Sequence, residues 1–158
     1  MDIRVKYFNV PEDMQLQQTK VGDWIDLRAV RIEVNGQAIE FDKVGDCVSY
    51  NKGDILKVYF GVAMELPKGY EAHVLPRSST FKNYHMTLVN SMGVIDCTYC
   101  GDNDEWFGVF LAHDWGLITR HDRVAQFRIM ENMPTLNPIP VEVLGNADRG
   151  GHGSTGKQ

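Results

Sequence analysis

Cysteine is scarce in this chain of 158 residues, which contains only Cys47, Cys97 and Cys100. A small and odd number of cysteines argues against the disulfide framework of a small secreted protein and indicates reduced thiols. Cys97 and Cys100 have the spacing of a zinc knuckle or a redox dithiol, but two thiolates supply only half of a tetrahedral zinc site. The five histidines show no paired ligand spacing that would complete such a site. We therefore interpret the cysteine spacing as incidental.

Long apolar runs and a basic excess are also missing. No stretch approaches the ~20 apolar residues that a membrane-spanning helix needs, so we expect no membrane association. The first residues, MDIRVKYF, lack the basic and then apolar layout of a signal peptide, which predicts a cytoplasmic protein. A net charge of −5 does not favour the displacement of counterions from a nucleic acid, so we expect no direct nucleic-acid binding.

A helical stripe of ten or more residues is absent, and residues 79–86 have room for one short helix at most. Several segments instead alternate apolar and polar side chains with the period of two that is typical of a β-strand. Turn signals rich in glycine, proline, asparagine or aspartate separate these segments, which are residues 2–8, 55–62, 70–75, 124–130 and 139–143. The pattern predicts an all-β fold, either a barrel or a jelly-roll-like sandwich.

The size and composition of the chain fit a single domain. Hydrophobic side chains make up 43% of the sequence and charged side chains 23%, close to ordinary globular usage. Residues 145–158 differ, because they contain five glycines and almost no apolar side chains. Such a segment cannot bury itself. We therefore expect a β domain over residues 1–144 and a mobile tail over residues 145–158.

The glycines of this tail resemble a nucleotide-binding motif. The pattern Gly151-x-Gly153-x-x-Gly156 matches the dinucleotide-binding fingerprint, but that motif works only between a strand and a helix. Consecutive glycines can still form an anion-binding nest of backbone N–H groups. Ser154 and Thr155 add hydroxyl groups and Arg149 adds positive charge. This composition favours a lid that orders over a phosphate chain.

Five stretches along the chain form an ordered set of motifs. They are residues 22–29 (GDWIDLRA), 76–79 (PRSS), 90–102 (NSMGVIDCTYCGD), 123–127 (RVAQF) and 149–156 (RGGHGSTG). The set resembles that of the trimeric deoxyuridine 5′-triphosphate nucleotidohydrolases, the dUTPases. The resemblance implies a jelly-roll-like distorted β-barrel that hydrolyses dUTP to dUMP and pyrophosphate with Mg²⁺ on the triphosphate. It also implies a homotrimer whose active sites are built from neighbouring subunits.

The resemblance assigns the chemistry of phosphate cleavage to particular residues. Asp96 would orient and deprotonate a water molecule for attack on the α-phosphate. Asp26 would contact Mg²⁺ through the ion's own water ligands, which suits a cation that sheds water reluctantly. The triphosphate would bind side chains that offer positive charge, hydroxyl or amide groups, namely Arg77, Ser78, Ser79, Gln126, Arg149, Ser154 and Thr155. Arg77 would neutralise charge or support its loop, and Gln126 would bind a phosphate or a water.

The third motif would recognise uracil and the sugar. A hairpin over residues 93–99 can offer backbone N–H and C=O groups to the edge of the base, and Gly93, Val94 and Ile95 are expected there. Asn90 would add a side-chain or water-mediated contact. The ring of Tyr99 would pack under the sugar and leave no room for a 2′-hydroxyl. On a regular strand Asp96 and Tyr99 project to opposite faces. We therefore predict a distortion of the hairpin over residues 96–99.

Two features depart from the family pattern. Many members carry a phenylalanine that stacks on uracil where this chain has His152. We predict that the stacking ring comes instead from residues 104–107, as in a bacterial and phage-like branch of the family, with Phe107 favoured over Trp106. Residues 35–54 form a longer connection than a compact member needs, and they can carry a surface hairpin.

Two alternative functions stay open. A dCTP deaminase of the same fold would need a catalytic glutamate and a site that reads cytosine, whereas the pattern GVIDxxYxGD points to uracil. A phage-type dUTPase can also double as a regulatory, repressor-binding protein. Residues 35–54 are the expected contact for such a protein partner.

Overall fold

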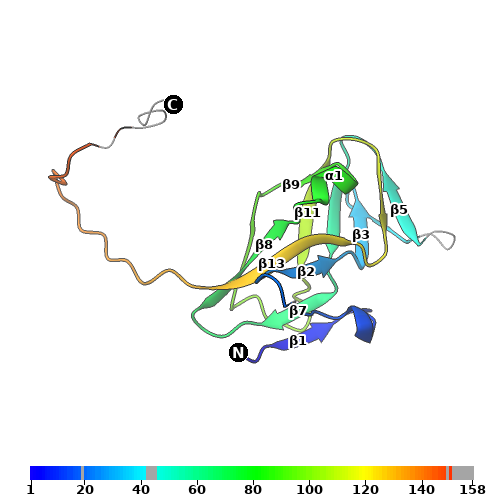
Figure 1. Cartoon of the computed structure of the whole chain (residues 1–158), viewed down its shortest axis with the longest axis horizontal. Coiled ribbons are helices and arrows are strands. Elements are labelled where there is room, and N and C mark those ends of the chain that lie inside the picture. The colour runs from blue at the N-terminus through cyan, green and yellow to red at the C-terminus, as the bar shows by residue number, and fades with distance from the viewer. Residues whose placement is uncertain (19, 42–45, 149, 151–158) are drawn as a thin grey trace.

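The computed structural model in Figure 1 describes residues 1–18, 20–41, 46–148 and 150. Within these residues the chain forms thirteen strands, the short 3₁₀-helix η1 (Glu12–Met14) and the short α-helix α1 (Thr80–Tyr84). This composition confirms the predicted all-β fold. The strands are β1 (Arg4–Tyr7), β2 (Ile25–Arg28), β3 (Arg31–Val34), β4 (Gln37–Ile39), β5 (Cys47–Tyr50), β6 (Ile55–Tyr59), β7 (Val62–Glu65), β8 (Tyr70–Pro76), β9 (Met86–Leu88), β10 (Gly93–Asp96), β11 (Phe107–Ala112), β12 (Gly116–Thr119) and β13 (Arg123–Glu131).

The described strands form two larger sheets and two strand pairs. The four-stranded sheet has the order β10-β8-β13-β2, and the five-stranded sheet has the order β4-β3-β6-β11-β9. The pairs are β1-β7 and β12-β5. All of these pairings are antiparallel. This arrangement is consistent with a jelly-roll-like fold.

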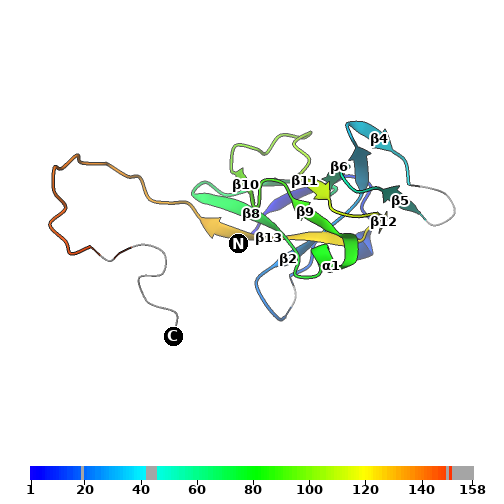
Figure 2. The same cartoon turned by 90° about the horizontal axis from the view of Figure 1, so that it is seen from above.

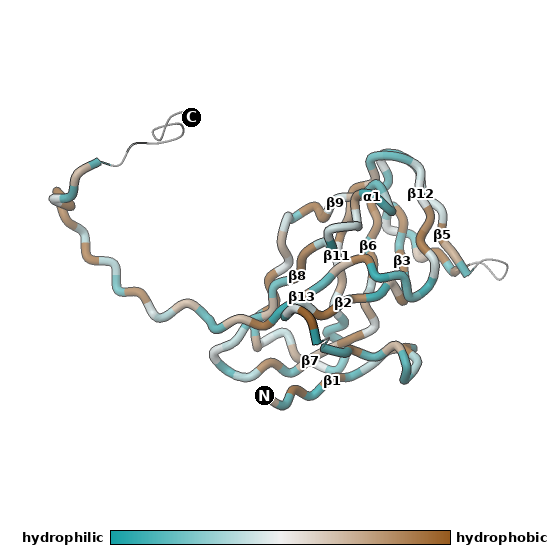
Figure 3. Tube along the Cα trace, in the orientation of Figure 1, coloured by the Kyte–Doolittle hydropathy of each residue, from teal (hydrophilic) through white to brown (hydrophobic). Residues whose placement is uncertain are grey.

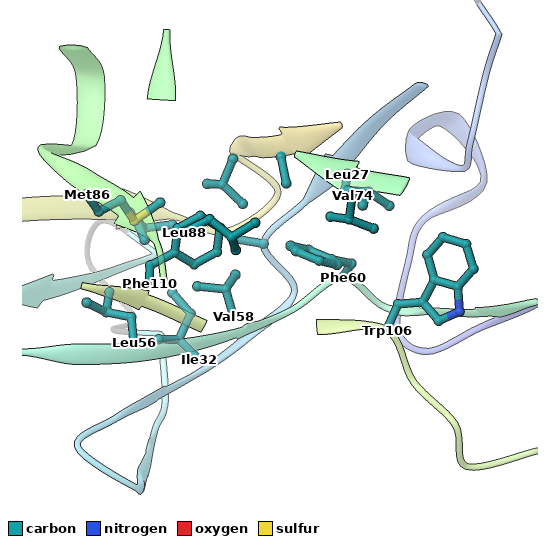
Figure 4. Close-up of a cluster of buried hydrophobic side chains, with 14 of the residues drawn as sticks. Leu27, Ile32, Leu56, Val58, Phe60, Val74, Met86, Leu88, Trp106 and Phe110 are labelled. Carbon is teal, nitrogen blue, oxygen red and sulfur yellow. The ribbon is translucent and has the colours of Figure 1, made fainter. Parts of the chain in front are cut away.

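The inner faces of both larger sheets share one hydrophobic core (Figure 4). In β6, Leu56 and Val58 are fully buried, as the alternation of the sequence predicts. Val74 of β8 and Phe127 of β13 bury their side chains from the other sheet. Trp106, just before β11, lies edge-on against Phe127 with 5.3 Å between ring centroids. The core therefore fixes the strands from which the functional loops emerge.

The sequence segments predicted to be strands are mostly found, with one interruption. Residues 55–62 do not form a single strand, because β6 ends at Tyr59 and β7 begins at Val62. Between them Gly61 has a φ of +68°, and a Cβ there would lie 2.6 Å from the side chain of Val10. Only glycine fits this tight bend. The short helix expected within residues 79–86 is α1.

The segment 35–54 contributes the turn and the second strand of a hairpin whose first strand is β3. Asn35 and Gly36 have φ values of 51° and 81°, which suit the tight turn between β3 and β4. The side-chain amide of Asn35 donates to Asp54 Oδ1 at 2.8 Å and ties the turn to the next connection. β4 lies at the edge of the five-stranded sheet and is exposed along its length. Further along, β5 pairs with β12.

The strand predicted over residues 139–143 is wrong. After β13 ends at Glu131, residues 132–148 form no strand, and we call them the C-terminal arm. The arm leads away from the sheets in both views (Figures 1 and 2). Hydrophobic positions recur along this part of the trace (Figure 3). The large apolar side chains of the arm are exposed, and they are Met133, Leu136, Ile139, Val141, Val143 and Leu144. An alternating segment becomes a strand only beside a pairing partner, and the described part of the chain offers none here.

Two further points concern the C-terminal tail and the helices. Most of the tail predicted over residues 145–158 lies outside the described residues, so its mobility and the domain boundary at residue 144 stay predictions. In the part of the chain that the structure describes, neither helix has the length and apolar character needed to cross a membrane.

Candidate active site

A cavity of about 440 Å³ opens beside β10. We call it the β10 cavity. It brings together seven of the predicted site residues, which are Asn90, Gly93, Val94, Ile95, Asp96, Tyr99 and Phe107. Val74, Thr98 and Trp106 complete its lining. The third motif and the start of β11 therefore share one opening.

The position of β10 depends on a close approach to β8. Gly93 pairs with Val74, and a Cβ on Gly93 would lie 3.2 Å from the Cβ of Val74. A side chain on residue 93 would make this contact tight, so the glycine suits the close approach of the two strands. β10 is also the edge strand of its sheet, so the side of its backbone that faces away from β8 is open to a ligand.

The predicted distortion of the hairpin is present directly after β10. The strand ends at Asp96, and residues 97 and 98 form a turn. The turn is closed by the backbone N–H of Tyr99, which donates to the carbonyl of Asp96 at 3.3 Å. This break in the alternation allows Asp96 and Tyr99 to line the same cavity.

Asp96 is exposed, and its carboxylate is held by Thr98. Its Oδ1 accepts hydrogen bonds from the hydroxyl of Thr98 at 2.5 Å and from the backbone N–H of Thr98 at 2.7 Å. The hydroxyl and then the N–H lower the pKa of Asp96, because both stabilise the charged form. Asp96 is therefore an ionised carboxylate with a fixed orientation at neutral pH.

The aromatic residues of the cavity differ in exposure. Phe107 is 39% exposed and lies at the opening, whereas Trp106 is fully buried against the core. Tyr99 is half-buried, and its hydroxyl donates to the carbonyl of Glu105 at 3.3 Å. Burial raises the pKa of Tyr99, so it stays a neutral hydroxyl. Of these rings, that of Phe107 is the most available to a ligand.

A second group of predicted site residues lies around the end of β8. Asp26 Oδ1 accepts a hydrogen bond from Arg77 Nε at 2.6 Å, and Asp26 Oδ2 lies 3.0 Å from Arg123 Nη1. Arg77 Nη1 donates to Ser79 Oγ at 3.4 Å. Gln126 Nε2 donates to the carbonyl of Pro76 at 3.2 Å. We call this group the Arg77 cluster; it comprises Asp26, Arg77, Ser78, Ser79 and Gln126.

A buried threonine supports the loop of the Arg77 cluster. Thr80 is fully buried, and its hydroxyl accepts from the backbone N–H of Arg77 at 2.9 Å while it donates to the carbonyl of Val124 at 2.9 Å. These two bonds tie the end of β8 to β13. Ser78 is exposed beside them, so its hydroxyl can reach a ligand.

No protein-family model matches this chain. Over 156 residues, which cover 99% of each chain, it is 47% identical to the SPbeta prophage-derived deoxyuridine 5′-triphosphate nucleotidohydrolase YosS of Bacillus subtilis. The chain belongs to the dUTPase family. It is also 34% identical over 119 residues to the dUTPase of a Thermoanaerobacter species, covering 73% of this chain and 78% of the relative.

Solved dUTPases share the fold of this chain. The Streptococcus mutans dUTPase superposes with a TM-score of 0.66 at 19% identity, covering 84% of this chain and 98% of that enzyme. The dUTPase of Staphylococcus phage 80alpha, solved with dUpNHpp, superposes with a TM-score of 0.67 at 19% identity, covering 99% of each chain. At this level of identity the superpositions establish the common fold.

The dUTPase residues predicted from the sequence thus fall into two separate groups. Asp96 pairs with Glu71 at the start of β8, whereas Gln126 pairs with Leu75 near its end. Glu71 and Leu75 are 75 − 71 = 4 residues apart on β8, which is about 13 Å at roughly 3.3 Å per residue. Since β10 and β13 lie on opposite sides of β8, two strand spacings of about 4.8 Å separate Asp96 and Gln126 further. Within one chain, none of the residues of the Arg77 cluster lines the β10 cavity.

Some predicted residues cannot be placed, and others were missed. Arg149, Ser154 and Thr155, together with His152, lie outside the described residues. Thr98 was not predicted, although an aspartate side chain often accepts from the backbone N–H two positions further on, as Asp96 does from Thr98. Thr80 was also missed, because its role depends on a contact with Val124 that no local pattern encodes.

Proposed function

We propose that this dUTPase hydrolyses dUTP to dUMP and pyrophosphate. The observation that carries the proposal is the β10 cavity, which combines an ionised carboxylate, an open strand edge and aromatic side chains in a chain of this family. Its volume of about 440 Å³ suits a nucleoside, because small-molecule sites span roughly 300–1,000 Å³.

The open edge of β10 is the expected contact for uracil. Uracil presents one N–H donor between two carbonyl acceptors, and the backbone of Gly93, Val94 and Ile95 can match that pattern with its own N–H and C=O groups. The side chain of Asn90 adds a polar contact at the same opening. Phe107 stacks on the base, and the ring of Tyr99 packs under the sugar and excludes a 2′-hydroxyl.

Asp96 acts as the general base. Because Thr98 occupies Oδ1, the carboxylate is oriented, and Oδ2 accepts a proton from the attacking water. The water oxygen forms a bond to the α-phosphorus, and the bond from this phosphorus to the bridging oxygen of the β-phosphate breaks. Pyrophosphate leaves with that bridging oxygen, and Asp96 retains the proton until it is released to solvent.

The residues present fit an indirect role in Mg²⁺ binding. No three His, Cys, Asp or Glu side chains gather closely enough to hold a metal ion among the described residues, so a cage made of protein ligands is not present there. Mg²⁺ bound to a triphosphate keeps several waters, and Asp26 would accept hydrogen bonds from them. Each carboxylate oxygen of Asp26 accepts a hydrogen bond from one arginine, and its remaining lone pairs can accept from such waters. When bound, the ion would neutralise charge that develops on the phosphates.

A homotrimer with shared sites explains the separation of the two groups. If the β10 cavity of one copy faces the Arg77 cluster of another, Asp96 and the phosphate-binding residues meet at one nucleotide. The C-terminal arm supports this arrangement, since it extends away from its own sheets with apolar side chains exposed and is suited to lie on a neighbouring copy. It would carry Arg149, Ser154 and Thr155 to the triphosphate as a closing lid.

A substrate panel tests the proposed function. Pyrophosphate release should occur with dUTP and be absent or very slow with dTTP, dCTP and UTP, and it should require Mg²⁺. Ammonia from dCTP would favour the deaminase alternative. A folded wild-type protein that releases no pyrophosphate from dUTP would contradict the proposal.

Removing the hydroxyl of Thr98 should change the pH dependence of hydrolysis. Asp96 works as a carboxylate, so activity is lost as pH falls through its pKa. Thr98→Val removes the bond that lowers this pKa most, and the acid limb of kcat/KM should therefore move to higher pH. Thr98→Ser keeps the hydroxyl and should keep the wild-type limb. The pH profiles of wild type and both variants are measured on the same substrate, so titration of the substrate phosphates affects all three equally. An acid limb that does not move in Thr98→Val would refute the role of Thr98 in lowering the pKa of Asp96.

A further inference from the structure

Three neighbouring strands place Arg31, Tyr59 and Phe107 side by side, on the face of the five-stranded sheet opposite the core. Tyr59 of β6 pairs with Arg31 of β3 on one side and with Phe107 of β11 on the other. The guanidinium carbon of Arg31 lies 3.3 Å from the centroid of the Tyr59 ring. The rings of Tyr59 and Phe107 are 5.7 Å apart, with 50° between their planes. Such a cross-strand pair restrains both rings.

Lys57 joins the two rings from the next position on the same face of β6. Its Nζ lies 4.2 Å from the centroid of Phe107 and 4.8 Å from the centroid of Tyr59. Both distances are within the range of a cation–π interaction. Tyr59 is itself fixed, because its hydroxyl donates to Glu33 Oε1 at 2.6 Å. Lys57 therefore connects Phe107 to a ring that has little freedom to move.

The backbone that leads into Phe107 is anchored through Glu105. The side chain of Glu105 is only 12% exposed. Its Oε1 accepts from the backbone N–H of Gly61 at 3.1 Å, and its Oε2 accepts from Arg31 Nη2 at 3.0 Å. Arg31 thus stacks on Tyr59 and also holds the residue two positions before Phe107. The backbone and the ring are restrained by the same group of side chains.

We propose that Lys57 and Tyr59 are positioning residues, which hold the ring of Phe107 at the opening of the β10 cavity before the nucleotide binds. An exposed phenylalanine that moved freely would have to be ordered on binding, which weakens affinity. With the ring already in place, stacking on the base does not carry that cost. This inference rests on the proposed function, in which Phe107 stacks on uracil.

The substitution Lys57→Met tests the inference, because it removes the charge and keeps a stem of similar length. We expect the Kd for the analogue dUpNHpp and the KM for dUTP to rise about fivefold, as the loss of one cation–π contact implies. The kcat should stay close to the wild-type value, since Lys57 acts on base binding through Phe107 and not on the phosphate. Lys57→Arg keeps a cation over the rings and should restore affinity.

A double-mutant cycle distinguishes positioning from a direct effect of charge. In a Phe107→Ala background, Lys57→Met should not raise the Kd further, because the ring on which Lys57 acts is absent. Lys52→Met, in an exposed turn, is the matched control and should leave Kd unchanged. An equal loss from Lys57→Met in both backgrounds, or an unchanged Kd in the single variant, would overturn the inference.

The same series separates this inference from the proposed function. If Phe107→Ala leaves the Kd unchanged, the stacking role of Phe107 fails, and the inference falls with it. If wild-type protein binds dUpNHpp but does not hydrolyse dUTP, the proposed reaction fails, and the Kd cycle still decides whether Lys57 positions Phe107. An unchanged thermal unfolding midpoint in Lys57→Met shows that a change in Kd does not come from unfolding.

Discussion

Asp96→Asn should lower kcat for dUTP hydrolysis by about a thousandfold, within the range contributed by a general base. The amide has nearly the shape of the carboxylate, and its Oδ1 can still accept both hydrogen bonds from Thr98. The side-chain amide nitrogen that replaces the other oxygen cannot take a proton from water. The loss should therefore appear in kcat, measured by pyrophosphate release, while the Kd for dUpNHpp stays near the wild-type value.

Asp102→Asn is the matched control for this experiment. Asp102 follows in the same motif, but its side chain is 89% exposed and lies 3.5 Å from the ammonium of Lys6. A surface ion pair of this kind contributes little, so the variant should keep wild-type kcat. Near-normal turnover in Asp96→Asn, or an equal loss in both variants, would remove Asp96 from the catalytic role.

Mixing two inactive variants should restore hydrolysis if neighbouring copies share each site. Asp96→Asn inactivates the β10 cavity, and Arg77→Gln removes the charge of the Arg77 cluster. When the two chains are unfolded together in equal amounts and refolded, a site that takes Asp96 from one copy and Arg77 from another is intact in about a quarter of cases. About a quarter of the wild-type rate should therefore return.

The controls for this mixture are each variant refolded alone and the two mixed without unfolding. These samples should stay near their starting low rates, and the size of each refolded assembly should match that of the wild type. If the co-refolded mixture has the correct size but no recovered activity, each site is built from one chain and the shared-site proposal is wrong.

Local patterns in the sequence predicted much of the fold. In β8 the alternation of Ala72 and Val74 with more exposed neighbours marks a strand with one face in the core, and the structure has it there. Turn residues such as Asn35 and Gly36 mark a hairpin by their tolerance of positive φ. A regular strand would point Asp96 and Tyr99 to opposite faces, although both are expected to contact one nucleotide. This conflict predicted the turn after β10.

Features that depend on distant contacts could not be predicted in this way. The alternation over residues 139–143 indicated a strand, but a strand needs a partner, and the arm has none among the described residues. The contact between Lys57 and Phe107 depends on the register of β6 with β11, which no short window of sequence contains. The same holds for the separation of Asp96 from Gln126, which follows from the positions at which they pair with β8.

Hydrolysis of dUTP in ¹⁸O-labelled water, with mass analysis of both products, tests the proposed reaction most directly. Attack on the α-phosphorus by a water that Asp96 activates predicts dUMP with one ¹⁸O atom and unlabelled pyrophosphate. Label in the pyrophosphate, or products other than dUMP and pyrophosphate, would contradict it.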